Sequence, residues 1–118
     1  MTFANFNDMY DLRLFNAQQG QYFFSPNALR SFRSRIQDLP PYGGCVFVTS
    51  EADFYGGHRR YSVRVMRADG GIDTWGTFRD YETREEAHRE AKWLGEQVRK
   101  GFLTYKDHKL FVEARSEE

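Results

Sequence analysis

Hydrophobic side chains recur every three or four residues in three stretches of the chain, and this period predicts three helices. The first stretch covers residues 7–19 and stops at Gly20, a residue that commonly ends helices. The second begins at Ser25-Pro26, because serine caps a free backbone N–H and proline has none to cap. The apolar positions are Met9, Leu12 and Phe15 in the first stretch and Leu29, Phe32 and Ile36 in the second.

The third predicted helix has the clearest boundaries. Thr83 and Glu86 have the spacing of a capping box, in which each side chain bonds the backbone N–H of the other residue. Lys100-Gly101 is a typical helix end. The apolar stripe is narrow and contains alanines that allow close approach to a sheet. It consists of Ala87, Ala91, Leu94 and Val98.

Alternating or β-branched residues predict three strands, at residues 45–50, 60–67 and 72–78. Asp69-Gly70-Gly71 joins the last two strands as a hairpin turn, because glycine readily adopts the positive φ that tight turns require. Residues 110–112 are a candidate fourth strand at an edge. We therefore predict an α+β fold of order ααβββα, with a three-stranded or four-stranded antiparallel sheet packed against helices.

The composition predicts one domain. The chain has 118 residues, of which 40% are hydrophobic, so residues 1–118 are expected to share one core, with 114–118 as a frayed acidic tail. The net charge is zero, from 17 basic and 17 acidic residues, so the chain as a whole does not attract nucleic acid or anionic lipid. The sequence has no apolar membrane span and no leader pattern, so we expect a cytoplasmic protein with no membrane partner.

Residues that commonly carry catalysis or bind metals are scattered along the chain. His58, His88 and His108 have no metal-ligand spacing, and we expect all three on the surface. Cys45 is the one cysteine, which excludes an internal disulfide, and it begins an apolar strand, so we expect a buried, unreactive thiol. No glycine pair has the pattern of a phosphate-binding loop. The prediction is a protein that is not an enzyme, with no catalytic residues, no metal site and no cofactor.

Arginine and aromatic residues form the most informative pattern. They are expected on the second helix and on the hairpin, and the candidate partner-binding residues are Arg30, Arg33, Arg35, Arg60, Arg64, Arg67, Trp75 and Arg79. Such residues dominate protein interfaces, and they also bind phosphates and stack on bases. A third interpretation is that they pair with nearby acids and remain hydrated. Whether Arg64 and Trp75 share one face of the sheet depends on the hairpin register.

Three phrases of the sequence resemble a family of small proteins found in bacteriophages, plasmids and bacterial genomes. They are FFSPNALRSFRSR at residues 23–35, GGCVFVTSE at residues 43–51 and RYSVR at residues 60–64, and the likeness covers about residues 17–91. The family has no assigned activity, so no catalytic residue carries over. The resemblance implies a short accessory protein of a mobile element, which binds a host factor and acts as a repressor or as an inhibitor of a defence system such as CRISPR or restriction.

A shorter stretch is similar to the last strand and helix of AP2-type and phage-integrase arm-binding domains. It comprises Trp75-Gly76-Thr77-Phe78, the capping segment 81–87 and Ala91. This likeness implies a sheet docked into the DNA major groove, but two predicted helices precede the sheet, and the net charge is zero where such domains are usually basic. We therefore expect a non-enzymatic protein that binds a host macromolecule, a protein in preference to a nucleic acid. A nucleic-acid-binding regulator is the alternative, and no particular oligomeric state is predicted.

Overall fold

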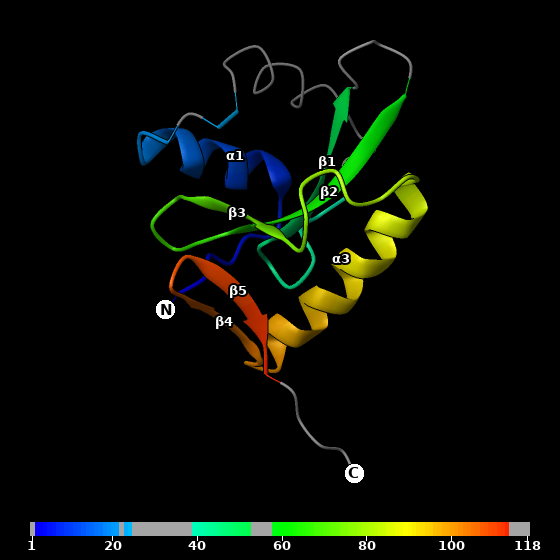
Figure 1. The fold of residues 1–118 in the computed structure, drawn as a ribbon. Helices are drawn as coiled ribbons and strands as arrows, with labels where there is room; N and C mark the ends of the chain where they lie inside the picture. The colour runs from blue at the N-terminus through cyan, green and yellow to red at the C-terminus, as the bar shows by residue number, and fades with distance from the viewer. Residues whose placement is uncertain (1, 22, 25–38, 53–57, 114–118) are drawn as a thin grey trace.

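The computed structural model describes residues 2–21, 23–24, 39–52 and 58–113. The second predicted helix, with Arg30, Arg33 and Arg35, lies outside the described residues. The elements in chain order are α1 (Met9–Gln18), β1 (Val46–Ala52), β2 (Arg59–Met66), β3 (Ile72–Trp75), α3 (Arg84–Arg99), β4 (Leu103–Lys106) and β5 (Lys109–Val112) (Figure 1). The predicted α+β class is confirmed.

A three-stranded antiparallel sheet has the order β1-β2-β3, with β2 in the centre. The turn between β2 and β3 forms as predicted, and Gly70 has a φ of 90° there. The returning strand is shorter than expected, because β3 ends at Trp75 and Gly76 turns the chain with a φ of 73°. Arg79, predicted at the end of this strand, instead lies in the following loop with a left-handed φ of 63°.

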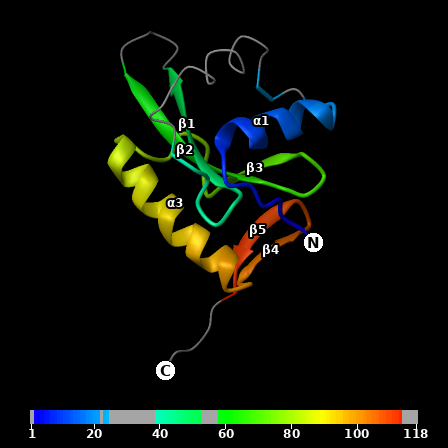
Figure 2. The ribbon, with the colours of Figure 1, turned by 180° about the vertical axis from the view of Figure 1, so that it is seen from behind.

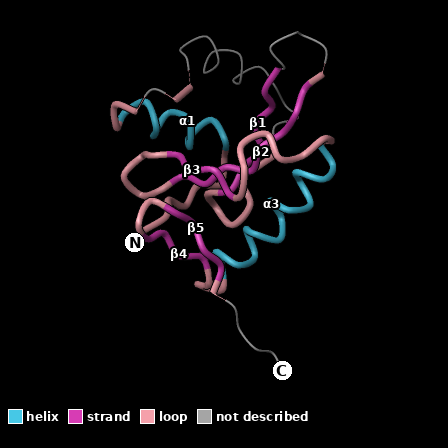
Figure 3. The backbone as a smooth tube through the Cα atoms, viewed as in Figure 1, coloured by secondary structure: helices cyan, strands magenta, loops and turns pink. Residues whose placement is uncertain are grey.

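The last predicted strand is β5, and it does not extend the three-stranded sheet. It pairs with β4 in a separate hairpin, which the tube in Figure 3 separates from β1–β3. The pattern missed β4 because its turn has no glycine. Asp107 and His108 themselves adopt left-handed φ values of 53° and 63°, a conformation that short polar residues tolerate.

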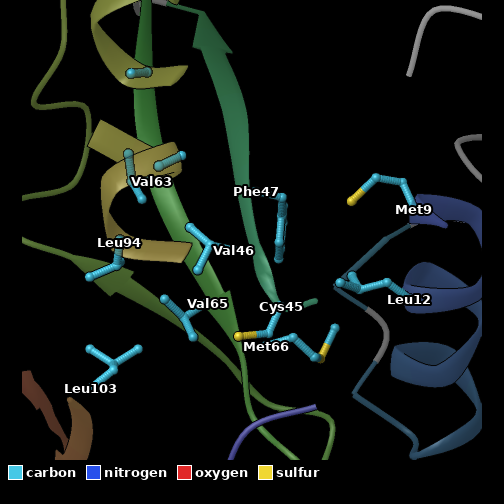
Figure 4. Packing of buried hydrophobic residues seen from close by; sticks show 12 residues of the cluster. Met9, Leu12, Cys45, Val46, Phe47, Val63, Val65, Met66, Leu94 and Leu103 are labelled. Carbon is cyan, nitrogen blue, oxygen red and sulfur yellow. The ribbon is translucent and has the colours of Figure 1, made fainter. Parts of the chain in front are cut away.

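The two faces of the sheet are covered by different helices. Val46 is paired with Val65 in the register, and Figure 4 shows both beside Leu94 of α3. The next residue, Phe47, points to the opposite face, where Met9 of α1 lies. Alternation along β1 therefore supplies both layers of the core. Its buried members are Met9, Leu12, Cys45, Val46, Phe47, Val63, Val65, Met66, Ala87, Ala91, Leu94 and Leu103.

The N-terminal end of α3 forms as the sequence predicts. Thr83 Oγ1 accepts the Glu86 backbone N–H at 3.1 Å, and a Glu86 carboxylate oxygen accepts the Thr83 N–H at 3.2 Å. The capping box is therefore complete, and the helix begins at Arg84 as predicted.

The middle of α3 lies against the turn that precedes β1. A Cβ atom built on Gly95 would lie 2.6 Å from Tyr42 Cβ and 2.9 Å from the Gly43 backbone nitrogen. Only glycine allows this approach, and the turn itself needs Gly43 and Gly44, which have φ values of 61° and 89°. The contact fixes Tyr42 beside the first turns of α3, where it meets His88.

Within the described ranges, no helix is both long and apolar enough to cross a bilayer.

Candidate functional site

Arg64, in the middle of the central strand β2, is the centre of a polar network on the α1 side of the sheet. Its guanidinium donates to Thr49 Oγ1 at 3.1 Å and to Thr74 Oγ1 at 2.9 Å, one hydroxyl from each neighbouring strand. It also pairs with Glu51 at 3.3 Å. The register places these partners around Arg64 because Thr74 is its direct partner on β3 and Thr49 lies diagonally across on β1.

Two phenylalanine rings contact the same guanidinium. The Arg64 Cζ atom lies 5.2 Å from the ring centroid of Phe23 and 5.0 Å from that of Phe78. The rings are 43% and 51% exposed, whereas the Arg64 side chain is only 12% exposed. The Arg64 guanidinium, which its polar partners hold in place, thus orients the two large apolar rings toward solvent. We call this set the Arg64 cluster: Phe23, Thr49, Glu51, Arg64, Thr74 and Phe78.

Arg60 and Arg79 lie at one end of the Arg64 cluster. Arg60 donates to the backbone carbonyls of Arg79 at 2.7 Å and Asp80 at 3.0 Å, and it lies 3.7 Å from Glu82. Ser62 accepts the Arg79 N–H at 2.8 Å and donates to the second oxygen of Glu51 at 3.0 Å. Glu51 therefore links the loop after β3 to the Arg64 network. A cavity of about 350 Å³ opens beside this loop. Its described lining residues are His58, Arg59, Arg60, Arg79 and Glu82.

Trp75 is not part of this surface. It is paired with Val63, whereas Arg64 is paired with Thr74, so the register places Arg64 and Trp75 on opposite faces. The Trp75 indole N–H donates to Glu90 of α3 at 2.9 Å, and its ring lies 6.2 Å from that of Trp93.

Arg67 is a second predicted site residue that lies elsewhere. Its guanidinium is 3.1 Å from Asp69 and from Asp73, and it covers the ring of Tyr105 at 4.6 Å. These contacts join the β2–β3 turn to the hairpin β4–β5. Arg67 therefore has a structural place in the fold, away from the Arg64 cluster.

His88 differs from its prediction. It is half-buried, and its Nδ1 lies 2.9 Å from the Tyr42 hydroxyl, because the turn before β1 reaches across to α3. Burial, and then the nearby Arg84, lower the pKa of His88. His58 and His108 are exposed as expected. Cys45 is fully buried, and burial raises the pKa of its thiol to about 12.

Sequence reasoning identified Arg64 but not the groups that hold it. The threonines and Glu51 have no motif, and their convergence depends on the register. Phe23 precedes a helix signal, so no periodicity marks it, and Phe78 was expected at the end of the strand 72–78, whereas β3 ends at Trp75. In the part of the chain that the structure covers, no group of three or more His, Cys, Asp or Glu residues could hold a metal ion.

Residues 8–92 match the model of a family described as one of unknown function, DUF7447. This region is well over half of the 118 residues. The chain belongs to the DUF7447 family. Comparisons of this DUF7447 protein with curated proteins and with solved structures gave no match. The family region includes α1, the three-stranded sheet, the first part of α3 and all of the Arg64 cluster, and it ends before β4.

Proposed function

We propose that this DUF7447 protein is a non-enzymatic binding protein that docks a macromolecular partner on the Arg64 cluster. One observation carries the proposal: an arginine held by three polar side chains orients two exposed phenylalanine rings. Arg60 and Arg79 extend the surface, and the predicted surface also includes Arg30, Arg33 and Arg35, which lie outside the described residues.

The balance of charge favours a protein partner. The Arg64 guanidinium is largely buried and pairs with Glu51, so it is poorly placed to bind phosphates. The Phe23 and Phe78 rings of the Arg64 cluster are held in place before a partner binds, which reduces the conformational entropy lost on binding. Aromatic and arginine side chains in such a setting are typical interface hot spots.

The sequence resemblance supports the nature of the partner. The resemblance to small bacteriophage and plasmid proteins implies an accessory protein that binds a host factor. The proposed partner is therefore a bacterial host protein in the cytoplasm, such as a component of a CRISPR or restriction system.

Capture from bacterial lysate tests this proposal when it is made dependent on one ring. The wild-type protein, Phe78→Ala and Phe111→Ala are immobilised side by side, and captured proteins are quantified by mass spectrometry. Phe111 is a matched control, because it is 47% exposed but lies on β5. We expect a protein that binds wild type and Phe111→Ala equally, with at least tenfold less on Phe78→Ala, since a hot-spot truncation costs about 2 kcal/mol or more. Equal capture by all three, or capture by none, contradicts the proposal.

Nucleic-acid binding is the second candidate, and the order of a three-stranded sheet followed by α3 favours it. The resemblance to AP2-type domains implies a sheet docked into the DNA major groove. In this protein α1 covers part of the sheet face away from α3, and Arg60 and Arg79 are described basic residues beside that face. Electrophoretic shift at low salt with duplex and single-stranded DNA tests this candidate. Retardation that falls steeply with added salt and is reduced in Arg60→Gln supports it, and no retardation eliminates it.

A further inference from the structure

A cavity of about 370 Å³ lies at the outer edge of β1, on the side away from β2. Figure 2 shows α1 and α3 on either side of the segment that leads into this strand. All of the described lining residues fall within the family region 8–92. They are Met9, Arg13, Leu39, Pro40, Tyr42, Phe47, Val48, Arg84 and His88.

The charged groups among these lining residues are both guanidiniums. Arg13 comes from α1 and is only 6% exposed, while Arg84 comes from the first turn of α3. Each also lies over an aromatic ring, Arg13 over Phe24 at 5.2 Å and Arg84 over Tyr61 at 5.4 Å. These two arginines are the charged residues of the described lining. Arg13 is buried and Arg84 is exposed, so an anion between them would meet one guanidinium away from solvent and one at the surface.

Tyr42 and His88 add polar groups between the two arginines. The Tyr42 hydroxyl and His88 Nδ1 are 2.9 Å apart, and the lowered pKa of His88 favours the neutral imidazole. When the hydroxyl donates to Nδ1, the remaining ring proton lies on Nε2, which is then a donor. In that tautomer the cavity combines guanidinium donors with an imidazole donor.

The other walls are apolar. Met9 of α1 and Phe47 and Val48 of β1 lie on one side, and Leu39 closes another. A ligand that fits both the arginine side and the apolar walls of the cavity has a compact anionic group and a small hydrophobic body. The volume is in the range of sites that bind small organic molecules.

We propose that this cavity binds a phosphate monoester of a small apolar molecule, with the phosphate between Arg13 and Arg84 and the apolar part against Met9 and Phe47. A phosphate monoester carries about −1.5 to −2 charges at pH 7, which matches the two guanidiniums better than a single carboxylate does. Arginine also binds phosphate through paired, charge-assisted hydrogen bonds. The cavity shares no residue with the Arg64 cluster, so this ligand site stands independently of the proposed function.

Calorimetric titration with phenyl phosphate at pH 7 and low salt tests the site, with benzoate in a parallel titration. We expect saturable one-to-one binding of phenyl phosphate and at least tenfold weaker binding of benzoate. Arg84→Gln should weaken phenyl phosphate binding by about tenfold, the scale of one charge-assisted hydrogen bond. Arg89→Gln is the matched control, because Arg89 is exposed on the same helix and does not line the cavity. It should bind as wild type does.

The His88 ring gives a second readout by proton NMR. Bound phosphate favours the imidazolium, so saturating phenyl phosphate should raise the pKa of His88, and the shift should be smaller in Arg84→Gln. No saturable binding up to about 10 mM would overturn the proposal, since a site with two arginines should hold a phosphate well below that. Equal weakening in Arg84→Gln and Arg89→Gln would also overturn it, and benzoate binding as tight as that of phenyl phosphate would refute the assignment to phosphate.

Discussion

Gly95 should respond to alanine substitution in the direction opposite to that of an ordinary helix glycine. In an exposed helix interior, Gly→Ala stabilises by about 1 kcal/mol, because alanine loses less backbone entropy on folding. In α3, however, the new Cβ would lie 2.6 Å from Tyr42 Cβ, 2.7 Å from the Tyr42 carbonyl carbon and 2.9 Å from the Gly43 nitrogen. Two of these three atoms are backbone, so they cannot move aside by a change of rotamer.

The magnitude follows from these two opposing effects. Overpacking a well-filled contact costs about 1–3 kcal/mol, and backbone neighbours place Gly95→Ala near the upper end. Subtracting the propensity gain of about 1 kcal/mol leaves a net loss of about 2 kcal/mol in the free energy of unfolding. For a chain of this size, the midpoint temperature should fall by about 4 °C per kcal/mol, or about 8 °C in total.

Urea denaturation followed by circular dichroism measures the free energy, and thermal denaturation gives an independent midpoint. Glu96→Ala, at an exposed position on the same helix, should lie within about 0.5 kcal/mol of wild type. Gly95→Val should be less stable than Gly95→Ala, because the steric conflict grows with the side chain. A Gly95→Ala variant as stable as wild type, or more stable, would refute the close approach of α3 to the Tyr42 turn.

Three further changes probe the fold and the cavity. Thr83→Ala should cost about 1 kcal/mol in urea denaturation by removing the helix cap, whereas Thr83→Ser should retain most of it; equal losses would contradict the capping role. Asn16→Ala should cost about 1–3 kcal/mol, because fully buried Asn16 donates to the Gly70 carbonyl at 2.8 Å and its loss leaves that carbonyl unsatisfied; a neutral effect would argue against the bond. The pKa of His88 is lowered in the folded state, so on acidification the unfolded chain takes up its proton first. The stability from neutral His88 is therefore complete above about pH 6.5 and is lost as the pH falls from there through the folded pKa. His88→Gln should reduce this slope in urea titrations between pH 5 and 8, and an unchanged slope would contradict the assignment.

Local signals predicted most of the described fold. The Thr83 cap, the Gly70 turn and the alternation of β2 are properties of neighbouring residues, so they could be predicted from sequence. The strand β4 could not, since it has four residues and its turn consists of Asp107 and His108 in a conformation that glycine or asparagine usually adopts.

The candidate site was only partly predictable, because its residues meet through register and long-range packing. A shift of one residue between β2 and β3 would have placed Trp75 on the face of Arg64, and the alternation of apolar residues alone does not exclude that shift. Likewise, the helical pattern placed His88 on the solvent side of α3. Its partner Tyr42 is 46 positions away along the chain, and no local pattern links the two.

The family region stops at residue 92, within α3, whereas the helix continues to Arg99. The segment beyond the stop includes Leu94 and Leu103, which are both buried and cover the sheet face of Val46 and Val65. The limit of sequence similarity is therefore not a limit of folding. A fragment ending at 92 would leave that face bare and prone to self-association. In this protein the residues after 92 therefore complete the core that the family region begins, without contributing to the Arg64 cluster.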